Sequence, residues 1–263
     1  MKLSQKKLFL LDMDGTLYLG DELFDGTIDF LNQVKKNGGK YVFVTNNSSK
    51  GADAYVTKLE RLGIKADVDD FYTSTDATIL YIKNKFPGRL FYVVGTRSFV
   101  KQLREVGINV TEELSEDVSG LIISNDNELT FKKLEDACML LCRDNIAYIA
   151  TNPDWVCPTA FGYVPDCGSF AEMIFKATGK KPYFIGKPRP DMLLLSMEKF
   201  GYTKDEAVMI GDRVYTDIAS GFNAGIDTVF VLSGEGTLDD AEKSDTPPTY
   251  IMKNIKEVYD NIK

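Results

Sequence analysis

Short apolar runs alternate with amphipathic stretches along the whole chain. Near the N-terminus, Leu8–Leu11 is apolar throughout, Thr27–Lys36 is amphipathic, and residues 41–44 form the next apolar run. The turn Asn37-Gly38-Gly39 separates the last two, as expected where a helix ends. Apolar runs that feed amphipathic helices are typical of a largely parallel sheet covered by helices. The pattern therefore predicts an α/β protein.

The alternation continues in three series. The first adds a helix that Ser48 or Ser49 caps and that runs to about Leu62, before Gly63. The second contains expected strands at residues 90–94, 121–123 and 146–150, helices at 99–106 and 131–143, and a loop-rich segment at 151–168. The third contains an extended segment at 183–185, helices at 190–200 and up to 224, and strands at 207–210 and 228–232. The second series is consistent with an inserted domain, bounded near Ala77 and Lys181.

Composition and charge exclude several classes of function. The chain has 263 residues, of which 44% are apolar and 27% charged, as in ordinary globular proteins. Its net charge of −8, from 39 acidic and 31 basic residues, argues against a nucleic acid polymer as partner. No run reaches the roughly 18 apolar residues of a membrane helix, and the first run stops at Asp12, so neither a membrane segment nor a signal peptide is expected. A cytoplasmic location is predicted.

Cysteine and histidine usage narrows the chemistry further. The four cysteines form no CxxC pair and are expected to be reduced, buried thiols; they are Cys138, Cys142, Cys157 and Cys167. The chain contains no histidine, which excludes Ser-His-Asp, Cys-His and phosphohistidine mechanisms. Acid–base chemistry near neutral pH must therefore come from carboxylates, lysine, tyrosine, cysteine or a metal-bound water.

Two carboxylates follow the first predicted strand. The motif Asp12-Met13-Asp14-Gly15-Thr16 begins where Leu8–Leu11 ends, and open parallel sheets bind their ligands beyond the carboxyl ends of the strands. Two acids two residues apart, followed by a glycine that permits a sharp turn, can hold a hard cation and present backbone amides to an anion. On its own, the motif leaves a calcium loop or a plain turn open.

Other expected strand ends carry polar groups that would converge on this pair in one parallel sheet. They are Thr45-Asn46-Asn47 after residues 41–44, Lys187 after residues 183–185, and Gly211-Asp212 with Asp217 after residues 207–210. Together they supply hydroxyl, amide, ammonium and carboxylate groups at one edge of the sheet.

These four motifs, in this order and over essentially the whole chain, resemble those of the haloacid dehalogenase-like (HAD) phosphatase superfamily. A finer resemblance is to the subgroup of p-nitrophenyl phosphatases and the N-acetylglucosamine-operon phosphatase (NagD-like). It rests on Thr45-Asn46-Asn47-Ser48, Ala150-Thr151-Asn152-Pro153-Asp154, Gly186-Lys187-Pro188, and Gly211-Asp212-Arg213 through Thr216-Asp217. The resemblance implies a Rossmann-like HAD core with a parallel sheet, formed by residues 1–77 and 182–263, and an inserted α/β cap domain of the C2 type at residues 78–181.

The resemblance also implies a mechanism. Mg²⁺ would be held by Asp12, the backbone carbonyl of Asp14, and Asp212, with Asp217 bound directly or through water. Asp12 would attack phosphorus and form an aspartyl phosphate. Asp14 would protonate the leaving oxygen and later deprotonate water, for which its pKa must be raised by burial or like charges.

The remaining roles concern binding. Thr45, Lys187 and backbone amides, including that of Asn46, would hold the phosphate, and Asn46 and Asn47 are expected to contact substrate. Asn152 and Asp154 are expected either to reach substrate from the cap or to form a proline-fixed loop with an Asx cap. Trp155 is expected as a buried indole, and Arg213 as an ion-pair partner.

The sequence thus predicts a phosphatase of small phosphorylated metabolites such as sugar phosphates or nucleoside monophosphates. The alternatives are a phosphotransferase or phosphomutase, and an aspartate-phosphorylated signalling or binding module. The presence of a carboxylate at Asp14 favours a phosphatase or phosphomutase over a dehalogenase or an ion-pumping ATPase. The substrate and the formation of a homo-oligomer are left open.

Overall fold

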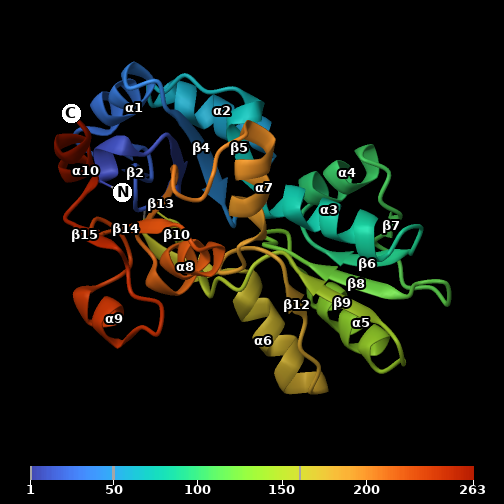
Figure 1. Cartoon of the computed structure of the whole chain (residues 1–263). Coiled ribbons are helices and arrows are strands. Elements are labelled where there is room, and N and C mark those ends of the chain that lie inside the picture. Colours follow the sequence, from blue (N-terminus) through green and yellow to red (C-terminus); the bar gives the residue numbers. More distant parts are fainter. Residues whose placement is uncertain (1, 49–50, 160) are drawn as a thin grey trace. The chain divides into compact units, whose positions relative to one another are not determined.

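The computed structural model describes residues 2–48, 51–159 and 161–263, which form two compact units (Figure 1). Unit 1 comprises Met1–Thr45, Ala52–Tyr72 and Lys187–Lys263, and unit 2 comprises Asn46–Gly51 and Thr73–Gly186. The sequence predicted the inserted domain at residues 78–181. The unit defined by contacts also takes in the short segment that follows Thr45.

Unit 1 is built on a six-stranded sheet in the order β15-β14-β13-β1-β4-β5. Its strands are β1 (Leu8–Leu11), β4 (Lys40–Thr45), β5 (Phe71–Thr73), β13 (Ala207–Gly211), β14 (Asp227–Val231) and β15 (Tyr250–Met252). The central strand β1 pairs in parallel with β13 on one side and β4 on the other, with Leu8 opposite Ala207 and Lys40. All four residues of β1 are buried, because the sheet is covered on both faces.

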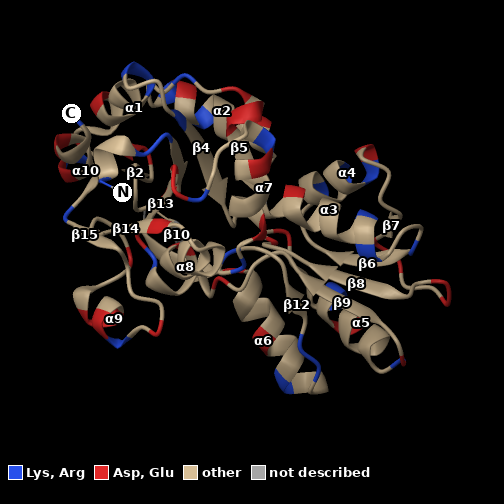
Figure 2. Cartoon of the chain, viewed as in Figure 1, with Lys and Arg blue, Asp and Glu red and all other residues tan. Residues whose placement is uncertain are grey.

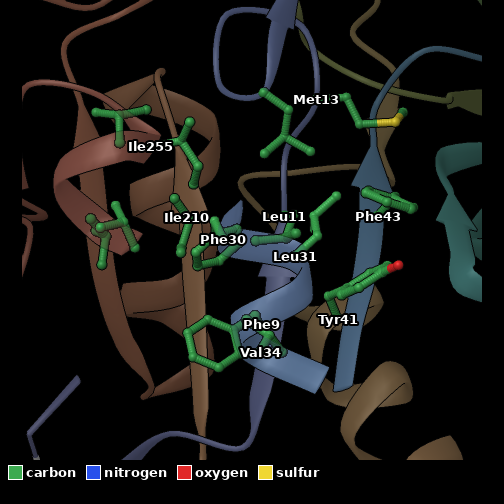
Figure 3. Close-up of a cluster of buried hydrophobic side chains, with 14 of the residues drawn as sticks. Phe9, Leu11, Met13, Phe30, Leu31, Val34, Tyr41, Phe43, Ile210 and Ile255 are labelled. Atoms are coloured by element: carbon green, nitrogen blue, oxygen red, sulfur yellow. The ribbon is translucent and has the colours of Figure 1, made fainter. Parts of the chain in front are cut away.

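Helices and a small hairpin complete unit 1. They are α1 (Thr27–Lys36), α2 (Ala52–Arg61), α7 (Asp191–Phe200), a π-helical turn (Val214–Ile218), α8 (Ala219–Ala224), α9 (Leu238–Lys243), α10 (Ile255–Ile262), and the hairpin of β2 (Tyr18–Leu19) and β3 (Glu22–Leu23). The apolar face of α1 packs on β1 (Figure 3), where the rings of Phe9 and Phe30 meet edge to face at 5.6 Å. Burying each such side chain contributes roughly 1.5–3 kcal/mol, which fixes the strand ends in place.

Unit 2 has a five-stranded sheet in the order β12-β9-β8-β6-β7, whose neighbours all pair in parallel. The strands are β6 (Phe91–Val94), β7 (Val110–Thr111), β8 (Gly120–Ile123), β9 (Ala147–Ala150) and β12 (Tyr183–Phe184), with a separate antiparallel hairpin of β10 (Val156–Thr159) and β11 (Gly162–Pro165). The helices are α3 (Ser74–Lys85), α4 (Arg97–Glu105), α5 (Phe131–Leu141) and α6 (Cys167–Thr178). Unit 2 has a hydrophobic core of its own around Tyr92, Leu121 and Ala150.

The predicted α/β class is confirmed, and the expected strands appear within about two residues of their predicted bounds. The prediction that Lys187 follows a strand of the same sheet as Asp12 is wrong, because β12 pairs with β9 in unit 2. Helix α3 was not predicted although Thr73 and Asp76 form its capping box. The segment expected to be loop-rich contains the β10–β11 hairpin and the start of α6. The predicted cap Ser49 lies outside the described residues.

Several surface features differ from the expectations. The four cysteines are thiols rather than disulfides, but only Cys167 is buried and Cys142 is exposed. Trp155 is 52% exposed, so the expectation of a buried indole is wrong. Lys and Arg are interspersed with Asp and Glu over the helices of both units (Figure 2). Among the described residues, no helix is long and apolar enough to cross a membrane.

Candidate active site

The carboxyl ends of three neighbouring strands of unit 1 carry predicted site residues. Asp12 follows β1 directly, Thr45 is the last residue of β4, and Asp212 follows β13 directly. The N–H of Asp12 donates to the carbonyl of Ile210 at 2.9 Å, which keeps β1 and β13 paired up to their ends. Because parallel strands end at the same edge, chain positions as distant as Asp12 and Asp212 are brought together.

Lys187 joins these strand ends through its ammonium group. Its Nζ donates to Asp12 Oδ1 at 2.7 Å, to Asp217 Oδ1 at 2.6 Å and to the carbonyl of Val44 at 2.9 Å, and the side chain is only 2% exposed. These three acceptors use all three N–H groups of the ammonium. Burial alone would lower the pKa of Lys187, but the charges of Asp12 and Asp217 outweigh it and raise the pKa. The lysine is therefore a permanent cation at the base of the site.

Three carboxylates cluster around this lysine. Oxygens of Asp12, Asp212 and Asp217 lie within 4.8 Å of one another. Burial and then the charge of Asp217 raise the pKa of Asp12 to about 7, and burial and then the charge of Asp12 raise the pKa of Asp212 to about 8. Three carboxylates, two of them buried and Asp12 15% exposed, with one lysine leave an excess of negative charge, which a cation would balance.

The donors of this cluster suit a hard cation. Every candidate ligand atom is a carboxylate oxygen, and Mg²⁺ prefers oxygen ligands at about 2.1 Å, which places opposite ligands roughly 4 Å apart. Two features hold Asp217 close to the end of β13. Its Oδ2 accepts from the N–H of Arg213 at 3.1 Å, and a Cβ on Gly211 would lie only 2.3 Å from the Cβ of Asp217. Glycine at position 211 is therefore what allows Asp217 to approach the strand end.

Asp14 lies outside the three-carboxylate cluster and is about a third exposed. Its Oδ1 lies 3.3 Å from Lys58 Nζ, and its Oδ2 accepts from the hydroxyl of Tyr18 at 3.4 Å. Burial and then the charge of Asp14 raise the pKa of Tyr18, so the phenol stays protonated and donates. Sequence reasoning missed both partners; only the spacing of four residues between Asp14 and Tyr18 pointed to one of them.

The remaining predicted residues lie in unit 2, where they hold one another. Asn46 Nδ2 donates to Asp154 Oδ1 at 3.0 Å, and Asn152 Nδ2 donates to the carbonyl of Asn46 at 2.8 Å. The N–H of Asp154 donates to Asn152 Oδ1 at 3.0 Å, which is the Asx turn that the sequence offered as one alternative. Asn47 Nδ2 lies 3.9 Å from Cys157 Sγ on β10. Their contact with substrate stays a prediction.

An ion pair and a loop lie next to Asp212. Arg213 forms an ion pair with Glu235, at 2.8 Å between Nε and Oε2, which confirms its expected role as an ion-pair partner. Glu235 itself was missed. It lies in a loop after β14 whose N–H groups contact Asp212. The one available signal was Ser233-Gly234-Glu235-Gly236, a glycine-rich turn after an apolar strand.

Two family models match the chain. The first is described as haloacid dehalogenase-like hydrolase and matches residues 9–109; the second is HAD-hydrolase-like and matches residues 184–258. These segments contain every residue of the carboxylate cluster and Lys187. An acid sugar phosphatase of Staphylococcus aureus (strain MRSA252) is 35% identical over 255 residues, covering 97% of each chain.

Solved structures resemble the chain over nearly its whole length. A 4-nitrophenylphosphatase from Thermotoga maritima shares 39% identity with a TM-score of 0.91 and covers 99% of both chains. A glycerol phosphate phosphatase from Mycobacterium tuberculosis, solved in complex with magnesium, shares 27% identity with a TM-score of 0.90, over 98% of this chain and 78% of that chain. The latter protein has also been solved in complex with calcium.

Proposed function

Because the chain belongs to the haloacid dehalogenase-like hydrolases and is a phosphatase of that family, we propose that it hydrolyses small phosphate monoesters with Mg²⁺ and with Asp12 as nucleophile. The observation that carries this proposal is the arrangement around Lys187. One buried ammonium holds Asp12 at 2.7 Å and Asp217 at 2.6 Å, within a cluster that also includes Asp212. Such a site can orient a nucleophilic carboxylate and neutralise an incoming phosphate.

The metal would be held by Asp12, Asp212 and Asp217, together with the backbone carbonyl of Asp14. When bound, Mg²⁺ supplies positive charge that offsets the repulsion between the carboxylates and a phosphate dianion. Oxygen-only ligands support Mg²⁺ over softer ions. Lys187, whose Nζ lies 2.7 Å from Asp12 Oδ1, would place a positive charge beside the phosphoryl group that Asp12 attacks, and the hydroxyl of Thr45 would donate to a phosphoryl oxygen.

The reaction would run in two steps. An oxygen of Asp12 forms a bond to phosphorus while the bond from phosphorus to the leaving oxygen breaks, and Asp14 gives its proton to that oxygen. In the second step Asp14 takes a proton from water, whose oxygen attacks phosphorus and releases Asp12 and inorganic phosphate. Asp14 lies outside the three-carboxylate cluster and is about a third exposed, which supports a role other than that of a carboxylate metal ligand.

The substrate class is proposed from the relatives and from unit 2. Relatives named acid sugar phosphatase and glycerol phosphate phosphatase support a phosphorylated sugar or polyol over a nucleotide. We assign unit 2 as the cap that selects among such substrates, with Asn46, Asn47, Asn152 and Asp154 as its candidate contacts. The four cysteine thiols, which are typical of reducing compartments, support the predicted cytoplasmic location.

Release of inorganic phosphate across a panel of substrates tests this proposal. The panel should contain hexose phosphates, glycerol phosphate, nucleoside monophosphates and p-nitrophenyl phosphate, each with Mg²⁺ and with excess chelator. We expect Mg²⁺-dependent release and a higher kcat/KM for sugar or polyol phosphates than for nucleotides. Full activity in excess chelator would refute the metal assignment, and a preference for nucleotides would refute the substrate class.

A further inference from the structure

A loop after β14 lies directly against the proposed metal ligand Asp212. The N–H of Glu235 donates to Asp212 Oδ2 at 2.7 Å, and the N–H of Gly236 donates to the carbonyl of Asp212 at 3.0 Å. The hydroxyl of Ser233 donates to the carbonyl of Gly15 at 2.8 Å, which ties the loop to the turn that follows Asp14. The loop of residues 233–236 therefore holds both the side chain and the backbone of Asp212.

Three glycines make this close approach possible. A Cβ on Gly234 would lie 1.9 Å from Asp212 Oδ2, and a Cβ on Gly15 would lie 2.4 Å from the same atom. A Cβ on Gly236 would lie 2.5 Å from the carbonyl oxygen of Asp212. All three distances are far below van der Waals contact, so a side chain at any of these positions would displace Asp212. The backbone itself forms the wall against which the carboxylate rests.

The side chain of Glu235 anchors the loop. Its Oε2 pairs with Arg213 Nε at 2.8 Å, and its Oε1 accepts from the hydroxyl of Tyr215 at 3.3 Å. Both partners follow Asp212 within three residues of the chain. The ion pair thus connects the loop to the segment that carries Asp212, and it lies outside the carboxylate cluster itself.

The contacts of Asp212 distinguish its two oxygens. Oδ2 accepts the short hydrogen bond from Glu235, whereas the one hydrogen bond to Oδ1 from the described residues comes from the hydroxyl of Thr16, at 3.4 Å. Oδ1 is therefore the oxygen left to bind a cation. We propose that residues 233–236 form a positioning loop that fixes Asp212 with Oδ1 turned toward Mg²⁺, so that the loop sets the affinity of the site for the metal. This inference rests on the proposed metal site.

Direct Mg²⁺ binding to the full chain, measured by calorimetry without substrate, tests the loop. Partners that orient a metal ligand typically contribute ~10–100-fold to metal affinity. Gly234→Ala places a methyl group against Oδ2 and should raise the Kd for Mg²⁺ at least ~10-fold. Glu235→Ala removes the anchor without adding atoms near Asp212 and should raise the Kd by a smaller factor. Glu235→Gln, which can still accept from Tyr215, should lie between Glu235→Ala and the wild type.

The matched control is Glu112→Ala, which removes an exposed glutamate paired with Arg104 at 3.3 Å in unit 2. It should leave the Kd for Mg²⁺ unchanged. A positioning role also predicts that Glu235→Ala regains most of its kcat at saturating Mg²⁺, whereas a merely structural role would lower the melting temperature without moving the Kd. Wild-type Kd values in both Gly234→Ala and Glu235→Ala would overturn the proposal.

Two further measurements distinguish a failure of the loop proposal from misfolding and from a failure of the metal site. If Gly234→Ala does not fold, as circular dichroism would show, the Kd of Glu235→Ala decides alone. Asp212→Asn separates the loop from the metal site: undiminished Mg²⁺ binding in that variant would refute the site itself. Loss of binding in Asp212→Asn, with normal binding in both loop variants, would refute only the positioning loop.

Discussion

Both units have a parallel sheet whose strands end in buried polar side chains, but the two sets differ in charge balance. In unit 2, Asp126 after β8 is paired with Lys133 at 2.7 Å, and Ser48 and Thr151 share a hydrogen bond at 2.9 Å. In unit 1, the cluster contains three carboxylates and one lysine, and the pKa values of Asp12 and Asp212 are raised to about 7 and about 8 by burial and then by the charges of neighbouring aspartates.

The ion pair in unit 2 is neutral on its own, whereas the carboxylate cluster in unit 1 needs a bound cation to become neutral. The charges of Asp126 and Lys133 cancel, and Lys133 also donates to the carbonyl of Gly95 at 2.8 Å. This pair therefore carries no surplus charge that would favour a cation. The cluster in unit 1 carries surplus negative charge at a place that burial makes costly, so a cation is favoured there. Polar residues at strand ends are therefore a weak sign of function until their charges are summed.

The largest expected effect comes from removing the nucleophile. Asp12→Asn keeps the shape of the side chain but not its nucleophilic oxygen, so turnover should fall by more than ~10³-fold while folding is retained. Phosphate release and circular dichroism measure the two outcomes. If this variant kept more than a few per cent of wild-type activity, the covalent mechanism would be wrong.

Removing Lys187 should have the next largest effect. Lys187→Ala leaves Asp12 and Asp217 without the cation that they share, and phosphate loses a nearby positive charge. We expect the loss in kcat/KM to correspond to about 2–4 kcal/mol of transition-state stabilisation, with changes in both kcat and KM. Steady-state kinetics at saturating Mg²⁺ measures this loss. A loss below tenfold would reduce Lys187 to a structural cation.

Mg²⁺ affinity should depend on pH, because the metal competes with protons on Asp12 and Asp212. Their pKa values in the folded chain lie above the ordinary aspartate value of 3.8, so the folded state binds more protons than the unfolded state between about pH 4 and 8. Without metal, stability should therefore fall as pH rises through this window. Mg²⁺ displaces these protons, so its Kd should decrease from pH 6 to 8, by up to ~10-fold per pH unit for each proton released.

Calorimetry at pH 6, 7 and 8, in buffers of different ionisation enthalpy, measures both the Kd and the protons released. The matched control is Asp260→Asn, an exposed carboxylate paired with Lys256 and outside the cluster, which should keep the wild-type pH dependence. A Kd that stays constant between pH 6 and 8, with no protons released, would contradict the raised pKa values.

The features that the sequence predicted correctly depend on local patterns, and those that it missed depend on contacts between residues far apart in the chain. The strands beside Asp12 and Asp212 were predicted because their apolar runs are local signals. The sheet to which β12 belongs was not predicted, because a strand of two residues contains no sequence signal for its pairing partner. Likewise, Lys58 beside Asp14 and Glu235 beside Asp212 meet their partners only through tertiary packing. Motif spacing located the carboxylates, but only the fold showed what holds each of them.

The smallest expected effect on activity comes from disrupting the Asp126–Lys133 ion pair in unit 2. Asp126→Asn removes one charge of a pair whose carboxylate is fully buried and whose lysine is 17% exposed. Because Lys133 keeps its bond to Gly95, we expect a loss of about 1–3 kcal/mol in the free energy of unfolding, measured in urea. The kcat/KM for p-nitrophenyl phosphate should stay within about twofold of the wild type, since neither Asp126 nor Lys133 belongs to the proposed metal and phosphate site. Asp260→Asn, an exposed carboxylate paired with Lys256, is the control and should not change stability measurably. If Asp126→Asn instead abolished turnover in a stable protein, strand ends of unit 2 would take part in catalysis, and charge balance would not distinguish the two sheets.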